Sequence, residues 1–333
     1  MNNNILRLGR MTCELPPFYA RFPWVGGDLQ TLRNTLHFTP PDLSSYNMRS
    51  LRLALRDGSG DELIATLNQP SEDHKKPLVV LIHGLTGSET SRNILASTAY
   101  HLSRGHPVLR LNLRNAGPSV GKCRHFYHAG RSQDLRDALA ALSGELLIRG
   151  AFLVGVSLGG NMLLKGLSER DGLDHVIGAA TVCAPIELKA AQRRIMARRN
   201  FVYQRHLLGF LVRDSRCIVQ GTPLESRLPA LRSIYDFDDQ IVAPLGGFTS
   251  ADDYYAHCSA APRLGAIAKP ALLIAAANDP WIPVTSYTSR EWPQNGPLSV
   301  AVTPGGGHVG FHAKDSAVPW HDRAIGAYID SLR

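Results

Sequence analysis

A serine in a glycine-rich turn is the side chain in this sequence best placed to act as a nucleophile. Residues 155–159 read Gly-Val-Ser-Leu-Gly, after an apolar run at 151–156 and before a helical pattern at 158–168. A sharp strand-to-helix turn lifts a serine hydroxyl above a sheet, and Gly155 and Gly159 leave room for the close-packed backbone. The N-terminus of the following helix then points at the reacting group. We therefore predict that Ser157 is a nucleophile.

A second match to the same G-x-S-x-G pattern has a different setting. Residues 117–121 read Gly-Pro-Ser-Val-Gly, and the polar residues Lys-Cys-Arg-His follow at 122–125. No helix is predicted there, and the proline beside Ser119 suits an ordinary loop. The setting therefore favours Ser157 over Ser119.

A serine hydroxyl is a weak nucleophile unless a base takes its proton and an acid orients that base. In folds with this kind of turn, the acid and then the histidine follow the serine along the chain. Asp279 follows the apolar run 271–277, and the carboxyl end of a buried strand lies at the ligand edge of a sheet. His308 lies in a glycine-rich loop after the apolar run 298–302. We predict Asp279 as the acid and His308 as the base, in preference to His312 and His321.

Stabilising a developing oxyanion takes two N–H donors. Leu158 directly follows the predicted nucleophile and would supply one of them. The loop after the apolar run 77–82 reads His83-Gly84-Leu85-Thr86-Gly87, and Leu85 N–H would supply the other. Gly84 would let this backbone approach a substrate closely.

Sites for cofactors and metal ions are not predicted. The chain contains neither G-x-G-x-x-G nor G-x-x-x-x-G-K-[ST]. His308 and His312 are four residues apart, but glycines surround them and no third ligand stands out, so we expect no zinc site.

Alternating strands and helices are expected to position these residues. A β-hairpin is predicted at 51–55 and 62–67, around Asp57-Gly-Ser-Gly. Short, unbroken apolar runs are typical of strands buried on both faces; they lie at 77–82, 107–113, 151–156, 176–182, 271–277 and 298–302. Helical patterns lie between or after them, at 92–104, 132–142, 158–168 and 320–332. This alternation predicts an α/β fold with a mostly parallel, doubly wound sheet of about eight strands.

One long segment interrupts the alternation. Residues 185–268 contain no strong strand pattern, and a structureless loop of that length is implausible in a compact domain. We expect an N-terminal arm at 1–48 with one short helix, a core at 49–184 and 269–333, and a helical cap inserted at 185–268.

Composition and charge limit the class of protein. The 333 residues are 44% hydrophobic and 19% charged, which is typical of a globular protein. Five scattered cysteines, without a CxxC pair, favour a reducing compartment, and no secretory signal or membrane-spanning run is expected. The net charge is +8, and residues 185–216 carry eight basic residues against two acidic ones. We expect a cytoplasmic protein that does not bind nucleic acid, and whose basic segment is either a solvated face or a contact with anionic lipid surfaces.

Motifs along nearly the whole chain resemble one known family. They include Leu29-Gln-Thr-Leu, His83-Gly-Leu-Thr-Gly, Asn112-Leu-Arg-Asn-Ala-Gly, Tyr127-His-Ala-Gly with Asp134, Gly155-Val-Ser-Leu-Gly-Gly-Asn, Tyr235-Asp-Phe-Asp-Asp, Pro244-Leu-Gly-Gly-Phe, Asp253-Tyr-Tyr, Asn278-Asp-Pro-Trp and Gly305-Gly-Gly-His-Val-Gly-Phe. The sequence is similar to the YheT-like branch of the α/β-hydrolase fold, which includes the mammalian ABHD lipid hydrolases. One departure from the pattern of that branch is the loop at Asn115-Ala116. The resemblance implies a carboxylesterase acting on acyl esters, some of them lipids, with Ser157, Asp279 and His308 as its triad.

Three functions are compatible with these residues. The first is a serine esterase, in which Ser157 forms an acyl-enzyme that water releases. The second is an acyltransferase or thioesterase with the same triad, because the acceptor is selected by the shape of the pocket. The third is a noncatalytic binding protein with a hydrolase fold.

Overall fold

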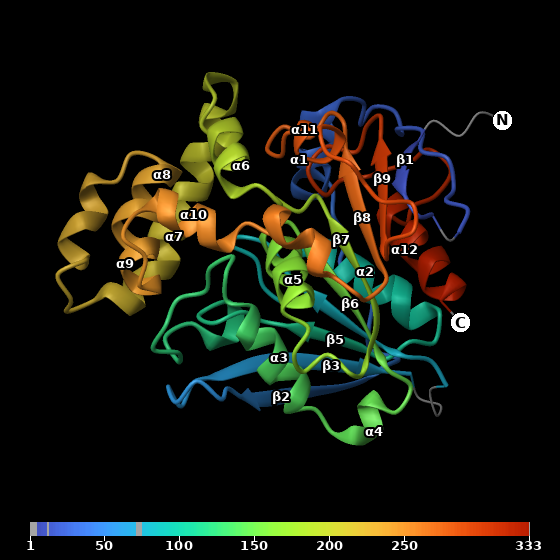
Figure 1. Cartoon of the computed structure of the whole chain (residues 1–333), viewed down its shortest axis with the longest axis horizontal. Coiled ribbons are helices and arrows are strands. Elements are labelled where there is room, and N and C mark those ends of the chain that lie inside the picture. The colour runs from blue at the N-terminus through green and yellow to red at the C-terminus, as the bar shows by residue number, and fades with distance from the viewer. Residues whose placement is uncertain (1–4, 12, 71–74, 333) are drawn as a thin grey trace.

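A twisted sheet of nine strands forms the centre of this computed structural model, which describes residues 5–11, 13–70 and 75–332 (Figure 1). The strands are β1 (Leu6–Gly9), β2 (Asn47–Ala54), β3 (Glu62–Gln69), β4 (Leu78–Ile82), β5 (Val108–Leu111), β6 (Ala151–Val156), β7 (Val176–Val182), β8 (Ala271–Ala276) and β9 (Leu298–Thr303). Their order across the sheet is β1-β9-β8-β7-β6-β4-β5-β3-β2.

The six central strands, from β5 to β9, pair in parallel, and β1, β2 and β3 pair antiparallel at the two edges. Strands β4, β6, β8 and β9 are buried along their whole length. Helices therefore cover both faces, which explains the unbroken apolar runs in the sequence. The predicted α/β fold, its mostly parallel sheet and its opening hairpin are confirmed.

The helices are α1 (Gly27–Leu36), α2 (Arg92–Ser103), α3 (Ser132–Ala140), α4 (Gly144–Leu147), α5 (Leu158–Glu169), α6 (Leu188–Ile195), α7 (Phe201–Val219), α8 (Ile234–Phe237), α9 (Ala243–Gly246), α10 (Ala251–Cys258), α11 (Thr285–Thr288) and α12 (Trp320–Ser331). Helices α2 and α12 pack together, as do α3 and α5. Because crossovers between parallel strands are right-handed, the strand order puts these two pairs on opposite faces of the sheet.

The N-terminal arm contains a strand that the apolar pattern of the sequence does not predict. Residues Leu6–Gly9 form β1, which pairs antiparallel with β9 and makes the sheet one strand larger than expected. This strand is only four residues long, and Leu6 and Arg7 are exposed at the edge of the sheet. It therefore lacks the continuous apolar pattern by which the central strands are recognised. Residues 1–4, part of the N-terminus in which no secretory signal is expected, lie outside the described part of the chain.

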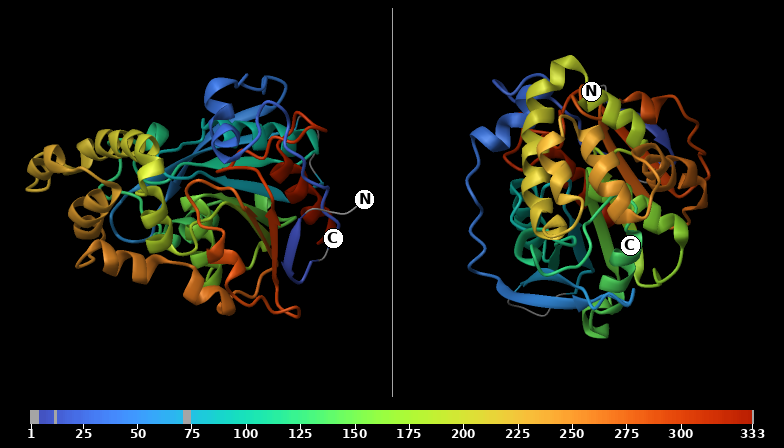
Figure 2. Two further views of the ribbon diagram at one scale, coloured as in Figure 1. Left: turned by 90° about the horizontal axis from the view of Figure 1, so that it is seen from above. Right: turned by 90° about the vertical axis from the view of Figure 1, so that its left-hand side faces the viewer.

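Helices α6 to α10 occupy the long segment between β7 and β8. They gather at one end of the molecule, beyond the sheet, where α7 is the longest of them (Figure 2). A π-helical turn, η4 (Asp238–Val242), joins α8 to α9. In the described residues, no helix combines the length and apolar character needed to cross a bilayer.

Five of the buried histidines among the described residues have a lowered pKa, and burial is the main cause in each. The pKa is lowered to about 4 in His83. It is lowered to about 3 in His101, His128, His312 and His321. Both ring nitrogens of His101 and of His321 lack a hydrogen-bond partner within the described residues. Protonating these imidazoles would place a charge away from water, so the folded state keeps them neutral.

Unfolding is therefore expected to take up protons as the pH falls below about 6.5, where exposed imidazoles become charged. Burial raises the pKa of Asp238 and of Asp322 to about 7, and these two groups act in the opposite sense because the folded state binds their protons first. A net uptake of about three protons lowers the free energy of unfolding by about 4 kcal/mol per pH unit near pH 5. Denaturant titrations from about pH 7.5 to 5 measure this slope.

The variant His321→Gln supplies the control for this prediction. It removes one of the histidines that must stay neutral, so the proton uptake on unfolding, and with it the slope, should fall by roughly a third. Unfolding free energies that stay constant between pH 7 and 5 would contradict the prediction.

Candidate active site

Ser157 occupies the sharp turn between β6 and α5. Its backbone adopts φ 51° and ψ −122°, a strained conformation for a residue with a side chain. The N–H of Ser157 donates to Val182 O on the neighbouring strand at 2.8 Å, which fixes the turn to the sheet. This backbone presents the hydroxyl at the carboxyl end of β6, next to the N-terminus of α5.

Crowding explains the two glycines of the motif. A Cβ at Gly155 would lie 2.6 Å from both Gly159 O and the Cα of Gly160. A Cβ at Gly159 would lie 2.4 Å from His83 O. Both contacts are with backbone, which cannot move aside without opening the turn. Gly155 and Gly159 thus allow α5 to pack directly against β6 and the end of β4.

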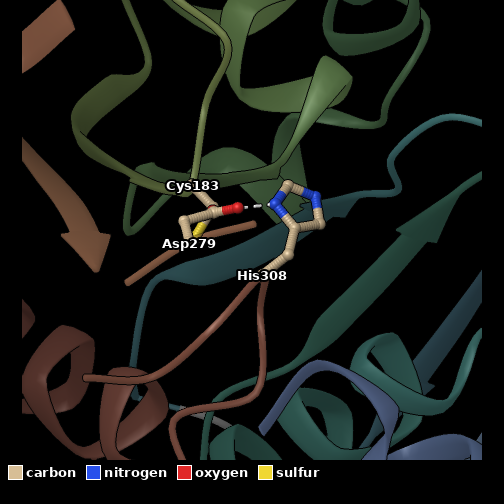
Figure 3. Close-up of side chains that lie close together, drawn as sticks. All are labelled: Cys183, Asp279 and His308. Atoms are coloured by element: carbon tan, nitrogen blue, oxygen red, sulfur yellow. Dashed lines mark hydrogen bonds and ion pairs between the residues drawn. The ribbon is translucent and has the colours of Figure 1, made fainter. Parts of the chain in front are cut away.

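The predicted base and acid lie beside the serine. The Nε2 atom of His308 is 2.9 Å from Ser157 Oγ, and its Nδ1 atom is 2.9 Å from Asp279 Oδ2. Figure 3 shows the carboxylate of Asp279 facing the imidazole. The other oxygen, Oδ1, accepts from the N–H groups of Trp281 and Ile282 at 2.8 and 3.0 Å. With the carboxylate accepting at Nδ1–H, Nε2 is left to accept the serine proton.

The loop that carries His308 is held from both sides. The backbone N–H of His308 donates to Thr31 Oγ1 on α1 at 2.8 Å, and the N–H of Gly307 donates to Asn278 Oδ1 at 3.0 Å. The indole ring of Trp281 lies against the imidazole, with ring centroids 4.3 Å apart. His308 and Asp279 are both buried, whereas Ser157 is partly accessible.

The two predicted oxyanion donors lie next to Ser157. Leu158 is the first residue of α5, and a Cβ at Gly84 would lie only 3.0 Å from that of Ser157, so the loop containing Leu85 passes over the serine. Within the described residues, neither Leu85 N–H nor Leu158 N–H donates to another protein atom. Both N–H groups therefore remain available to a ligand.

The ring of His83 holds this loop in place. Its Nδ1 lies 2.8 Å from Gly84 O, and its Nε2 accepts from Leu113 N–H at 3.1 Å. Because Nε2 accepts, Nδ1 carries the proton and donates to the carbonyl. Burial lowers the pKa of His83 to about 4, so the ring stays neutral and keeps this arrangement at neutral pH. The sequence predicted this loop as a source of an oxyanion donor but indicated no role for the His83 side chain.

The rival residues have other surroundings. The Ser119 hydroxyl is buried and donates within its own loop, to Ala116 O or Leu113 O. His321 lies 3.5 Å from Asp322, and His312 bonds through its backbone to Gln30. None of the three contributes to the chain of contacts that includes Ser157.

Cys183, Asp279 and His308 each offer one atom that could ligate a metal ion, and these atoms lie within 4.8 Å of one another (Figure 3). Metal ligation requires a thiolate, but burial raises the pKa of the Cys183 thiol well above its ordinary value. Both nitrogens of His308 already face Asp279 and Ser157. These contacts favour proton transfer over metal binding at this position.

A cavity of about 560 Å³ opens above Ser157 and His308. Its walls come from the 84–93 loop, from α1 and from the helices of the 185–268 segment. Most of the side chains from that segment are apolar, among them Leu188, Ile195, Leu207, Leu211 and Ile234. The cavity can therefore receive an aliphatic chain beside the serine hydroxyl.

Comparisons with known proteins agree with this geometry. The sequence profile of the α/β-hydrolase fold family matches residues 77–315. The chain is 35% identical to the candidate esterase YheT of Escherichia coli (strain K12), over 78% of this chain and 77% of that protein. It is 27% identical to the medium-chain fatty acid ethyl ester synthase/esterase 2 of Saccharomyces cerevisiae, over 76% of this chain and 61% of that protein.

Solved structures show the same fold. The Pyrococcus furiosus esterase Pf2001 aligns with a TM-score of 0.57 and 18% identity, over 88% of this chain and 93% of that one. The family profile and the similarity to YheT together show that this chain belongs to the α/β-hydrolase fold family, in its YheT-like branch.

Proposed function

We propose that the protein is a serine carboxylesterase that hydrolyses acyl esters. The observation that carries this proposal is the continuous chain from Ser157 through His308 to Asp279, with two contacts of 2.9 Å, at the base of a largely apolar cavity. The names of the relatives agree with it, because YheT is described as a candidate esterase and the yeast relative as an ester synthase and esterase.

The reaction proceeds in two halves. His308 Nε2 takes the Ser157 proton while Oγ bonds to the ester carbonyl carbon, and the N–H groups of Leu85 and Leu158 donate to the resulting oxyanion. The intermediate collapses, and the alcohol leaves with the proton from His308. A water molecule then gives its proton to His308 and attacks the acyl-enzyme, which releases the acid and restores Ser157.

The 185–268 segment acts as a cap in this proposal. Its helices follow the carboxyl end of β7 and supply much of the cavity wall above the serine. An aliphatic acyl chain would pack on those side chains, so the shape of the cap would select chain length.

Turnover of p-nitrophenyl esters, from acetate to dodecanoate, tests the proposed function. We expect kcat/KM to rise with chain length until the acyl group fills the cavity, because each buried methylene adds about 0.8 kcal/mol of transfer free energy. Longer chains should then lose rate. A folded protein that hydrolyses none of these esters would contradict the proposal and favour a noncatalytic binding protein.

Acyl transfer is a second candidate, favoured by the name of the yeast relative. The acyl-enzyme is common to both reactions, and only the acceptor differs. Adding ethanol during ester turnover and separating the products distinguishes them. Free acid as the main product would identify a hydrolase, whereas ethyl ester as the main product would identify a transferase.

We further infer that the cap contacts anionic lipid surfaces. Arg193, Arg194 and Arg198 are exposed near the start of α7, where the exposed fractions of Phe201 and Val202 are 59% and 75%. Arginines around exposed apolar side chains are typical of helices that lie at a membrane interface. In the cytoplasm, which is the compartment expected from the sequence, the anionic inner leaflet would supply such a surface.

Vesicle co-sedimentation tests this contact. We expect binding to phosphatidylserine-containing vesicles that weakens as salt rises, because each arginine near the surface contributes about 1 kcal/mol. The triple variant Arg193→Glu/Arg194→Glu/Arg198→Glu should lose the binding. The variant Arg49→Glu/Lys75→Glu/Arg149→Glu changes the net charge equally at exposed positions outside the cap and should keep it. Equal partitioning of the two variants would contradict a contact through the cap.

A further inference from the structure

One carboxyl group in the cavity wall has no part in the triad. Asp238 begins the π-helical turn η4 and lines the same cavity as Ser157. Its neighbours on the wall include the aromatic residues Phe237, Tyr254 and Tyr255. Insertions of the π type within helices often occur at functional sites.

The two oxygens of Asp238 have different surroundings. Oδ2 accepts from the Tyr255 hydroxyl at 2.6 Å. Oδ1 has no hydrogen-bond partner within the described residues, and no basic side chain described there forms an ion pair with Asp238. Burial raises the pKa of Asp238 to about 7, although the hydrogen bond from Tyr255 acts to lower it. The carboxyl can therefore accept or donate a hydrogen bond near neutral pH.

Two tyrosine hydroxyls in the same wall can each still donate a hydrogen bond. Tyr127 OH accepts from Thr86 N–H at 2.8 Å, and Tyr254 OH accepts from Ala129 N–H at 3.1 Å. The described residues show no acceptor for either hydroxyl proton. The wall thus combines a free carboxyl oxygen with unpaired O–H donors. A group that both donates and accepts hydrogen bonds complements this set.

We propose that Asp238, oriented by Tyr255, binds a hydroxyl group of the ester substrate inside the cavity. The ligand hydroxyl donates to Asp238 Oδ1, and a tyrosine hydroxyl can donate to the ligand oxygen. An ester with an alkyl group at this point covers the carboxyl oxygen and leaves it unpaired, which costs free energy. Such a site selects the hydroxylated ester over its alkyl analogue. The inference rests on the proposed esterase function and names the class of ester that the cavity selects.

The hydroxyl could belong to either half of the ester, and matched substrates separate the two cases. Propyl octanoate is the reference, 3-hydroxypropyl octanoate carries a hydroxyl on the alcohol, and propyl 8-hydroxyoctanoate carries one on the acyl chain. Choline octanoate tests the alternative that the carboxylate and its aromatic neighbours bind a cation. The readout is the ratio of kcat/KM for each substrate to that for propyl octanoate, measured within one protein.

We expect the wild-type protein to favour one hydroxy ester by about tenfold, as for one hydrogen bond to an acceptor that the substrate covers. Asp238→Leu should bring that ratio close to one, and Tyr255→Phe should reduce it. Asp238→Asn keeps the size of the side chain and supplies a second test if the leucine variant does not fold. Asp174→Leu, at an exposed acid outside the cavity, should keep the wild-type ratio.

The possible failures are distinguishable. Hydrolysis of propyl octanoate without preference for either hydroxy ester would overturn the inference and leave the esterase function standing. A preference that survives in both Asp238 variants would also overturn it. A preference for choline octanoate that these variants lose would identify a cation site instead. Absence of hydrolysis with every ester would overturn the esterase function itself.

A second inference concerns the N-terminal arm, and different contacts carry it. Helix α1, labelled in Figure 1, lies outside the segment matched by the family profile. It nevertheless contacts the loop of His308 through a hydrogen bond from His308 N–H to Thr31. Gln30 is fully buried; its Nε2 donates to His312 O at 3.0 Å, and its Oε1 accepts from His312 N–H at 2.7 Å. A Cβ at Gly307 would lie 2.3 Å from Gly27 O, so the loop packs directly on the helix.

We infer that Thr31 and Gln30 are positioning residues for the His308 imidazole. Thr31 Oγ1 accepts from His308 N–H and donates to Gly27 O at 2.7 Å, which ties the base to the first turn of α1. Gln30 fixes the same loop four residues further on, at His312. Losing the hydrogen bonds of either residue would let the imidazole move relative to Ser157. Small displacements of a catalytic group lower the rate of the reaction strongly.

The near-isosteric variant Thr31→Val tests this role. We expect kcat to fall by about tenfold to a hundredfold, and Thr31→Ser should restore most of it because the hydroxyl returns. Gln30→Ala should lower kcat similarly. Thermal unfolding of each variant shows whether the fold is intact, and a structural role alone would lower the midpoint without changing kcat at lower temperature. A kcat within twofold of wild type in folded Thr31→Val would overturn the inference.

Discussion

Replacing Ser157 with alanine is expected to lower kcat for ester hydrolysis by about 10⁶-fold. The variant keeps the cavity, His308 and the N–H donors but loses the atom that attacks the carbonyl. Ester binding should therefore persist while no acyl-enzyme forms. Steady-state rates and a single-turnover burst, measured on the purified variant, check both points.

Ser119→Ala is the matched control, because Ser119 lies in the other G-x-S-x-G sequence of the chain. Its hydroxyl donates within its own loop. We expect near-wild-type turnover in that variant. Loss of turnover in Ser119→Ala together with retained turnover in Ser157→Ala would overturn the assignment of the nucleophile.

The second large effect is expected from Asp279→Asn, with a fall in kcat of about 10⁴-fold. The N–H groups of Trp281 and Ile282 donate to Oδ1, so an asparagine would keep its carbonyl oxygen there and turn its NH₂ group toward His308. Nδ1 would then have to accept, and Nε2 would carry the proton. In that tautomer the imidazole cannot take the proton of Ser157.

Thermal unfolding should change little in Asp279→Asn, since the amide has the same shape as the carboxylate. A rate within tenfold of wild type would show that another acid orients His308. Asp238, Asp239 and Asp253 would then be the next candidates, although all three have other contacts. Asp238 accepts from the Tyr255 hydroxyl. Asp239 accepts from Ala251 N–H, and Asp253 accepts from Thr249 N–H.

The central strands and the candidate triad could be predicted from sequence because each has a local signature. Strands buried on both faces read as short apolar runs, and the residues at their carboxyl ends must meet at one edge of a parallel sheet. That rule alone places Ser157, Asp279 and His308 at one edge, although Ser157 and His308 are 151 residues apart.

Contacts between distant segments account for what the sequence did not reveal. Gln30 bonds to His312 across 282 residues, and no local pattern at either position indicates the pairing. The short strand β1 depends on the exposed edge of β9 and not on its own apolar content. The role of His83 emerges only when the loop after β5 brings Leu113 to its ring. The motif Leu29-Gln-Thr-Leu was the one signal in the arm, and it indicated a resemblance without a role.

Labelling with a fluorophosphonate followed by peptide mass spectrometry tests the central claim most directly. The probe reacts with a serine whose hydroxyl is activated by a neighbouring base. We predict one adduct per chain, on Ser157, which is absent in Ser157→Ala and greatly slowed in His308→Ala, and which persists in Ser119→Ala. An adduct on Ser119, or undiminished labelling of Ser157→Ala, would contradict the account.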